Sequence, residues 1–172
     1  MDDRPKFLVD RMLGRLVAWL RIFDYDTLSA LELHVEGDED RRLVELALEQ
    51  GRVLLSRDRG LIERAKAAGV KAILLSPDKV TDQLCELIKH FPINTVPVMD
   101  RCTVCNSLLS KATLDDLQHT TDQVPQHLVE ENTEFWACSQ CGKIYWMGSH
   151  WRNIQKTARE IDECKKWMMT PE

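Results

Sequence analysis

Two Cys-x-x-Cys pairs constrain this chain more than any other feature of its sequence. The pairs are Cys102/Cys105 and Cys138/Cys141, and 32 residues separate them. Two residues between cysteines let both thiolates of a pair face one ion from a tight turn, and two such turns complete a tetrahedral four-sulfur site for zinc. We therefore predict one structural zinc ion, held by these four cysteines, that organises the C-terminal part of the chain.

Disulfide or redox chemistry is the alternative to zinc for these cysteines. The chain has six cysteines, and its first residues are charged and form no hydrophobic signal segment. We therefore expect a reducing, cytoplasmic location, in which zinc is the more natural use of paired Cys-x-x-Cys motifs. Cys85 lies in a helical apolar pattern and Cys164 lies near the C-terminus. We expect both to be packing residues rather than ligands.

Length and composition indicate a soluble globular protein. The 172 residues can form one ordinary core and a small second unit. Hydrophobic residues make up 44% of the chain and charged residues 30%. No apolar run approaches the roughly 20 residues that cross a bilayer, so no membrane association is expected. The net charge of −5 argues against a polycation that coats nucleic acid.

Strand-like and helix-like segments alternate through the first part of the chain. This rhythm predicts an α/β fold with a parallel sheet flanked by helices and right-handed crossovers. Strands are expected at 6–10, 25–29, 52–56 and 70–75, and helices at 12–23, 38–50, 61–68 and 80–90.

A proline-containing stretch at 91–97 is typical of a linker. We therefore place one domain at 1–95 and a second unit at 96–172. The second unit is expected to contain the zinc site, a polar insertion at about 112–132 that carries Thr121 and Asp122, and a C-terminal helix at 151–168.

Four acids are expected at one edge of the sheet, since sites in open parallel sheets form at the carboxyl ends of strands. Asp10 ends the first strand, Asp58 follows the strand 52–56, and Asp78 follows the fourth strand. Asp40 opens the helix that runs back into the strand 52–56. Carboxylates without histidine or cysteine suit Mg²⁺ or Mn²⁺. These ions stabilise the attacking and leaving oxygens of phosphodiester cleavage.

Arginines accompany these acids in the sequence. Arg57 and Arg59 bracket Asp58, and Arg15 follows Asp10, so guanidinium groups could hold phosphates there. Each feature alone has a simpler explanation, because an Asp after a strand is commonly a turn residue or an N-cap. Arginines likewise pair with acids on solvated faces. Only the joint pattern favours a catalytic site.

The chain resembles the Mut7-C ribonuclease domain family, in which a PIN-like nuclease domain precedes a zinc ribbon. The segment 7–21 is similar to the opening of the family, and the segment 51–61 to its central motif, where Thr is usual at the position of Ser56. The two cysteine pairs and the segment 145–151 are similar to its ribbon. The resemblance covers nearly the whole chain.

The resemblance implies a metal-dependent endoribonuclease whose acids are Asp10, Asp40 and Asp58. PIN nucleases typically have a fourth acid, a Glu on an early helix. Glu32 and Glu36 lie in an irregular stretch and give no clean equivalent. Asp78 is a candidate fourth acid on topology alone, and the number of metal ions stays open.

The role of the ribbon has two interpretations. Trp146 and His150 could contact RNA, because aromatic and basic residues stack bases and hold phosphates. Alternatively, Trp146 and Trp151 cover the interface between ribbon and nuclease domain, which is the interpretation we favour. For His150, ribbon packing and proton transfer also stay open.

The sequence thus predicts a cytoplasmic, Mg²⁺- or Mn²⁺-dependent endoribonuclease that hydrolyses single-stranded RNA by metal-activated water. The alternative from another class is a non-catalytic RNA-binding or protein-interaction module with a degraded acidic site. A third hypothesis is a toxin-like ribonuclease under the control of a protein partner. The residues do not decide between RNA and DNA.

Overall fold

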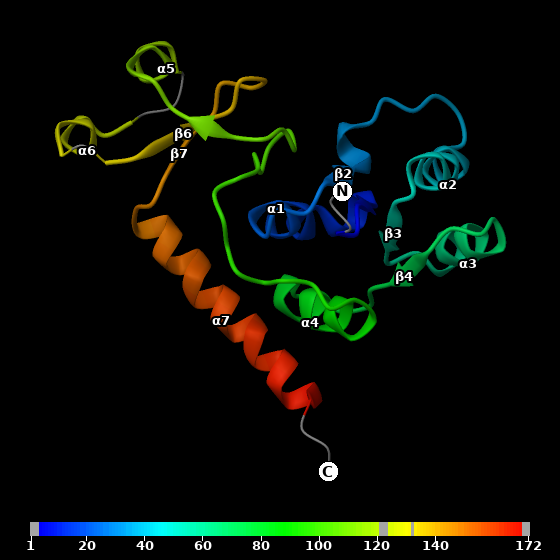
Figure 1. Cartoon of the computed structure of the whole chain (residues 1–172). Helices are drawn as coiled ribbons and strands as arrows, with labels where there is room; N and C mark the ends of the chain where they lie inside the picture. Colours follow the sequence, from blue (N-terminus) through cyan, green and yellow to red (C-terminus); the bar gives the residue numbers. More distant parts are fainter. Residues whose placement is uncertain (1–3, 121–123, 132, 170–172) are drawn as a thin grey trace.

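The computed structural model describes residues 4–120, 124–131 and 133–169, with side chains omitted at 165 and 167–169. Four parallel strands form the main sheet, in the order β2-β1-β3-β4 (Figure 1). These strands are β1 (Phe7–Val9), β2 (Thr27–Ser29), β3 (Val53–Ser56) and β4 (Ala72–Leu74). Leu8 of β1 pairs with Leu28 on one side and with Leu54 on the other. The predicted α/β fold with a parallel sheet is confirmed.

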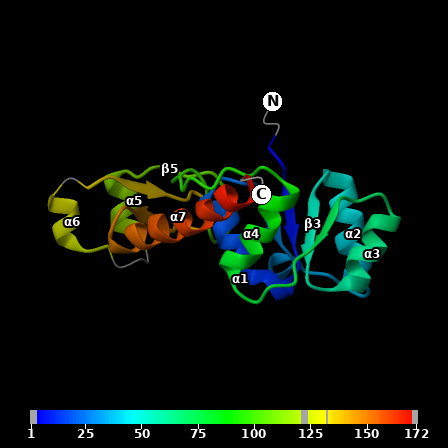
Figure 2. The same ribbon diagram turned by 90° about the horizontal axis from the view of Figure 1, so that it is seen from below.

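Helices cover both faces of this sheet, as Figure 2 shows from below. Phe7 and Val9 belong to a core cluster that includes residues of α1 (Gly14–Ile22) and α4 (Val80–His90). Leu8 and Leu54 belong to the opposite cluster with residues of α2 (Glu39–Gln50) and α3 (Arg59–Ala67). Burial on both faces explains why β1 and β4 are continuously apolar, and β3 is apolar up to Ser56, rather than alternating.

Two short 3₁₀ helices follow the first two strands. They are η1 (Arg11–Leu13), directly after β1, and η2 (Ala30–Glu32), directly after β2. The side chain of Asp10 caps η1 and that of Ser29 caps η2. The chain therefore turns sharply at the carboxyl edge of the sheet, where the acidic residues lie.

The second unit contains a small antiparallel sheet that we call the ribbon, comprising the described residues of 101–147. Its strands have the order β5-β6-β7 and are β5 (Ser110–Lys111), β6 (Phe135–Ala137) and β7 (Ile144–Trp146). The polar insertion forms α5 (Leu114–His119) and α6 (Gln126–Glu130). Thr121 and Asp122, which we assigned to this insertion, lie outside the described residues.

The C-terminal helix α7 (Ser149–Met169) leaves the ribbon and packs against α4. Figure 1 shows it running from the ribbon back beside the main sheet domain. Ala158 and Ile161 of α7 join the same core cluster as Phe7 and Val9. The helix thus contributes to the core of the first domain, and the boundary at 95/96 stays a prediction.

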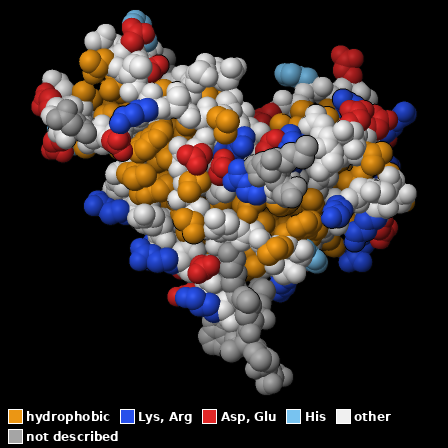
Figure 3. Space-filling model, in the orientation of Figure 1, with side chains coloured by type: hydrophobic (Ala, Val, Ile, Leu, Met, Phe, Trp, Pro, Cys, Tyr) orange, Lys and Arg blue, Asp and Glu red, His pale blue; other side chains and the backbone are white. Residues whose placement is uncertain are grey.

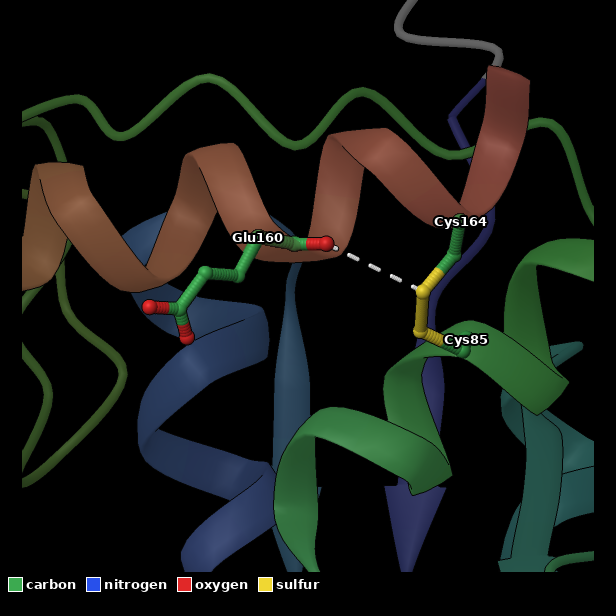
Figure 4. The surroundings of a disulfide bond; sticks show 3 residues. All are labelled: Cys85, Glu160 and Cys164. Atoms are coloured by element: carbon green, nitrogen blue, oxygen red, sulfur yellow. Dashed lines mark hydrogen bonds between the residues drawn. A yellow bond between two sulfur atoms is a disulfide. The ribbon is translucent and has the colours of Figure 1, made fainter. Parts of the chain in front are cut away.

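A disulfide joins α4 to α7, which corrects our prediction for two cysteines. Cys85 and Cys164 are bonded, with their Cα atoms 5.8 Å apart (Figure 4). The prediction that both are simple packing residues is wrong. Their sequence separation of 79 hid the pairing, since only the packing of α7 on α4 brings the two together.

Within the described residues, no helix combines the length and the apolar character needed to cross a membrane.

Candidate active site and metal centre

Ser56 connects two of the predicted acids at the carboxyl edge of the sheet. Its hydroxyl donates a hydrogen bond of 2.7 Å to Oδ2 of Asp10 and accepts one of 2.8 Å from the backbone N–H of Asp58. Ser56 is 0% exposed at the end of β3, so its hydroxyl has a fixed environment. Sequence reasoning missed this role and noted Ser56 only as a departure from the usual Thr.

Both connected acids also act as N-caps, as the simpler interpretation expected. Asp10 accepts a hydrogen bond of 2.6 Å from the backbone N–H of Arg11 through Oδ1. Asp58 accepts one of 3.1 Å from Leu61 N–H, also through Oδ1. Capping and metal binding are compatible, because a carboxylate offers about four lone-pair sites. The caps therefore fix where the two side chains lie.

The negative charges of other acids at this edge of the sheet affect the pKa of Asp40. Burial raises the pKa of Asp40, and the negative charges of Asp58, Asp38 and Asp10 raise it further against the opposing charge of Arg64. Bringing like charges together is unfavourable without a cation. Asp40 therefore interacts electrostatically with Asp10 and Asp58.

The oxygen atoms of these three carboxylates do not lie as close together as the ligand atoms of a preformed metal site. In the described part of the chain, only the four ribbon cysteines form a group of three or more ligand residues with all donor atoms within 4.8 Å. The acids are spaced more widely than that. Arg11 reaches across this edge to form an ion pair with Glu39, which directly precedes Asp40.

The candidate fourth acids lie elsewhere or have other partners. Asp78 forms an ion pair of 2.6 Å with Arg57, and its side chain is 86% exposed. It is not among the charges that act on Asp40. Glu32 forms an ion pair of 2.7 Å with the buried guanidinium of Arg21.

The three arginines that we assigned to substrate binding have different surroundings. Arg15 and Arg59 are exposed, whereas Arg57 is half-buried against Asp78 and also donates to the carbonyl of Ser76. Arg15 lines a surface groove together with Asp78 and residues of α4. Sequence reasoning did not find Arg64, whose charge acts on Asp40.

The four cysteines of the ribbon converge on one point. The Sγ atoms of Cys102 and Cys141 are 3.6 Å apart, and those of Cys105 and Cys138 are 3.3 Å apart. A tetrahedral zinc site with Zn–S bonds of about 2.3 Å places its sulfurs about 3.8 Å apart. The cluster could therefore hold a zinc ion with small adjustments.

The two cysteine pairs adopt the same backbone turn. The N–H of Asn106 donates to the carbonyl of Cys102, and the N–H of Gly142 donates to that of Cys138, at 3.1 and 2.9 Å. Asn106 and Gly142 have φ angles of 69° and 72°, a conformation that Gly and Asn adopt most readily. The turn explains why these two residue types follow the second cysteine of each pair.

The thiols of the cluster differ in acidity. Burial opposes ionisation of Cys105, but hydrogen bonds with Ser107 and with neighbouring thiols lower its pKa to about 6. Burial raises the pKa of Cys141 to about 12. Because zinc binds thiolates, binding would displace protons from the cluster.

The aromatic residues that we assigned to RNA contact or to the interface lie between the ribbon and α1. Trp146 is half-buried and packs on Phe135, with ring centroids 6.1 Å apart. Trp151 is buried at the start of α7, and His150 beside it is exposed. All three line one cavity, together with residues of α1.

Comparison with known families decides the affiliation of the chain. The model of the Mut7-C RNAse domain matches residues 5–158, a segment that contains the main sheet and the ribbon. The chain belongs to the Mut7-C RNAse domain family. No curated protein and no solved structure gives a significant match to it. Membership in the Mut7-C RNAse domain family indicates a ribonuclease-type function with RNA as the substrate class.

Proposed function

We propose that this Mut7-C RNAse domain protein is a metal-dependent endoribonuclease. The observation that carries the proposal is the Ser56 hydroxyl, which connects Asp10 to Asp58 beside Asp40. Three acids drawn together at the carboxyl edge of a parallel sheet favour binding of a hard cation. Asp10, Asp40 and Asp58 would hold Mg²⁺ or Mn²⁺, which supplies an activated water and stabilises charge on the phosphate.

The residues of the chain have distinct roles in this proposal. Ser56 holds Oδ2 of Asp10, and the N-cap hydrogen bonds hold Oδ1 of Asp10 and Oδ1 of Asp58. The side chains of Arg59 and Arg15 are exposed, so they can approach the phosphates of an RNA substrate. Arg57 would contact substrate only after exchanging its ion pair with Asp78.

A cleavage assay tests this function directly. Labelled single-stranded RNA and DNA are incubated with the purified full-length protein and Mn²⁺, Mg²⁺ or neither. The proposal expects metal-dependent cleavage of RNA that is lost in Asp10→Asn and Asp58→Asn, with zinc content unchanged. Asp115→Asn is the matched control, because Asp115 is an exposed acid of α5 in the ribbon. Full activity in both site variants would exclude the mechanism.

A non-catalytic RNA-binding module is the second candidate. The spacing of the three carboxylates, wider than that of the cysteine sulfurs, favours it. This alternative predicts RNA binding that is insensitive to Mg²⁺ and Mn²⁺, and no cleavage in the presence of either metal.

We further propose a nuclease domain at 1–95, a ribbon with a terminal helix at 96–172, and a cytoplasmic location.

A further inference from the structure

A cavity of about 400 Å³ lies where the ribbon meets the main sheet domain. Its walls come from α1, the segment 98–103, β7 and the beginning of α7. Figure 3 shows hydrophobic side chains on the surface where the ribbon strands approach the beginning of α7. The residues used below are Ala18, Ile22, Arg101, Lys143, Trp146 and Trp151, all of which line the cavity.

Gly148 leaves the space that the indole of Trp146 occupies at this cavity. A Cβ atom at position 148 would lie only 2.9 Å from Nε1 of Trp146, so a larger residue there would displace the ring. Phe135 supports the same ring from within the ribbon. The position of Trp146 is therefore specified by the local sequence.

Two indole N–H groups at this cavity have no acceptor within the described chain. No hydrogen bond involves the side chain of Trp146 or Trp151 in this part of the chain. The described residues also contain no buried side-chain N or O atom that lacks a partner. Both indole N–H groups must therefore reach solvent-accessible space. A buried tryptophan normally donates its N–H to a partner. Both tryptophans line the cavity, and Nε1 of Trp146 lies next to Gly148, which also lines it, so the cavity is bordered by indole groups whose N–H donors are unused within the described chain.

Two cationic side chains line the cavity, although the chain as a whole is acidic. These are Arg101 and Lys143, and among the described residues the cavity lining includes no carboxylate. Arg101 is held by Asp24, and Lys143 lies 5.7 Å from the centroid of the Tyr145 ring. The cavity therefore combines flat aromatic walls, hydrogen-bond donors and cations, which suits a base attached to a phosphate backbone.

We propose that this cavity holds one unstacked base of the RNA strand that the acidic edge cleaves. The substrate class rests on the proposed function. Arg15, Ala18 and Ile22 follow one another at spacings of three and four, so they share one face of α1. The nine residues of α1 span about 13 Å. An RNA strand that follows this face of α1 would extend from the acidic edge, at the start of the helix, to the cavity, at the end of the helix.

Photochemical cross-linking tests the location of the base. The full-length Asp58→Asn protein, with zinc bound, is irradiated with single-stranded RNA that contains 4-thiouridine, and cross-linked peptides are mapped by mass spectrometry. The proposal expects cross-links within residues 143–154. Cross-links confined to segments around Asp10 and Asp58 would overturn it.

Affinity measurements provide a second readout in the same Asp58→Asn background. The double change Trp146→Phe and Trp151→Phe keeps an aromatic ring at each position and removes both N–H donors, and should weaken RNA binding about fivefold or more. Trp136→Phe is the matched control, because Trp136 lies in β6 outside the cavity and should bind RNA unchanged. Equal affinity of the double variant and the control would overturn the proposal.

Three further outcomes distinguish this proposal from the catalytic proposal and from self-association of the chain. Cross-links at the cavity without cleavage by the wild-type protein support the base site and count only against the catalytic proposal. Cleavage without such cross-links does the reverse. If the protein self-associates without RNA, and the double variant abolishes that association, the cavity belongs to a second copy of the chain and the proposal is overturned.

Discussion

The hydroxyl of Ser56 lies 2.7 Å from Oδ2 of Asp10, although the two residues are 46 positions apart in the chain. The same oxygen accepts the N–H of Asp58, so one buried side chain fixes two acids of the proposed site. A hydroxyl can do this because it donates one hydrogen bond and accepts others. Asp10, which lies at a turn, is thereby connected through Ser56 to Asp58.

Removal of this hydroxyl should impair activity more than the fold. Ser56→Ala leaves Oδ2 of Asp10 and the N–H of Asp58 without their partner, which costs about 1–2 kcal/mol of stability. We expect kcat/KM for RNA cleavage to fall by about tenfold, on the scale of one lost positioning hydrogen bond. Ser56→Thr keeps the hydroxyl and should retain activity. Equal activity of the Ala and Thr variants would argue against the positioning role.

Arg21 should be among the residues most important for stability. Its guanidinium is 1% exposed and donates to Glu32 and to the carbonyls of Thr27, Thr103 and Val104. Arg21→Met removes these donors and should lower the free energy of unfolding by about 3–5 kcal/mol. Urea unfolding measures this loss. Arg42→Met, which removes an exposed partner of Glu45 and Glu49, is the control and should change stability little.

Asp26 should make folding sensitive to acid. Burial opposes its ionisation, but hydrogen bonds from Arg52 and Asn106 and the charges of Arg52 and Arg101 lower the pKa of Asp26 below 3.8. Its contribution is therefore complete above about pH 4 and disappears as the pH falls through the lowered pKa.

Asp26→Asn removes the titrating group and should reduce the dependence of the unfolding free energy on pH below pH 4. Comparing wild-type and variant proteins at equal zinc content isolates this effect. Asp82→Asn, an exposed acid in the first turn of α4, should keep the wild-type slope. An unchanged slope in Asp26→Asn would show that the ionised carboxylate contributes nothing to stability.

Removal of zinc should unfold the ribbon and spare the main sheet. Among the described residues, the hydrophobic cluster of the ribbon contains three buried side chains, those of Phe135, Ala137 and Ile144, whereas the main sheet has a larger buried cluster on each face. A chelator should therefore cause proteolysis within residues 101–147 while the 4–90 segment stays protected. Limited proteolysis with mass spectrometry checks this, and added Zn²⁺ should restore protection. Uniform digestion of the whole chain would contradict the expectation.

The disulfide between Cys85 and Cys164 should stabilise the packing of α7 on α4. Its loss in Cys85→Ser should lower stability by about 2–4 kcal/mol, because the bond closes a long loop. Cys164→Ser should have the same effect, and a reductant should destabilise only the wild-type protein. Titration of the denatured, zinc-free chain should find the four cluster thiols. Six reactive thiols would show that the bond does not form.

Features that depend on local spacing were predictable from the order of the amino acids. Two Cys-x-x-Cys turns with Asn106 and Gly142 behind them predict the cysteine cluster, because each turn is completed within a few residues. Continuous apolar strands that alternate with helices predict the parallel sheet, because burial on both faces demands that pattern. Asp10 and Asp58 follow strands, so their place at one edge was predictable too.

The pairing of side chains that are distant in the sequence follows from the packing of the folded chain. Nothing local to Glu32 shows that Arg21 binds it, or that Asp78 pairs with Arg57 away from Asp40. The bond between Cys85 and Cys164 likewise requires α7 to return to α4. These choices depend on which surfaces helix packing brings together, and short-range sequence patterns carry little information about such long-range contacts.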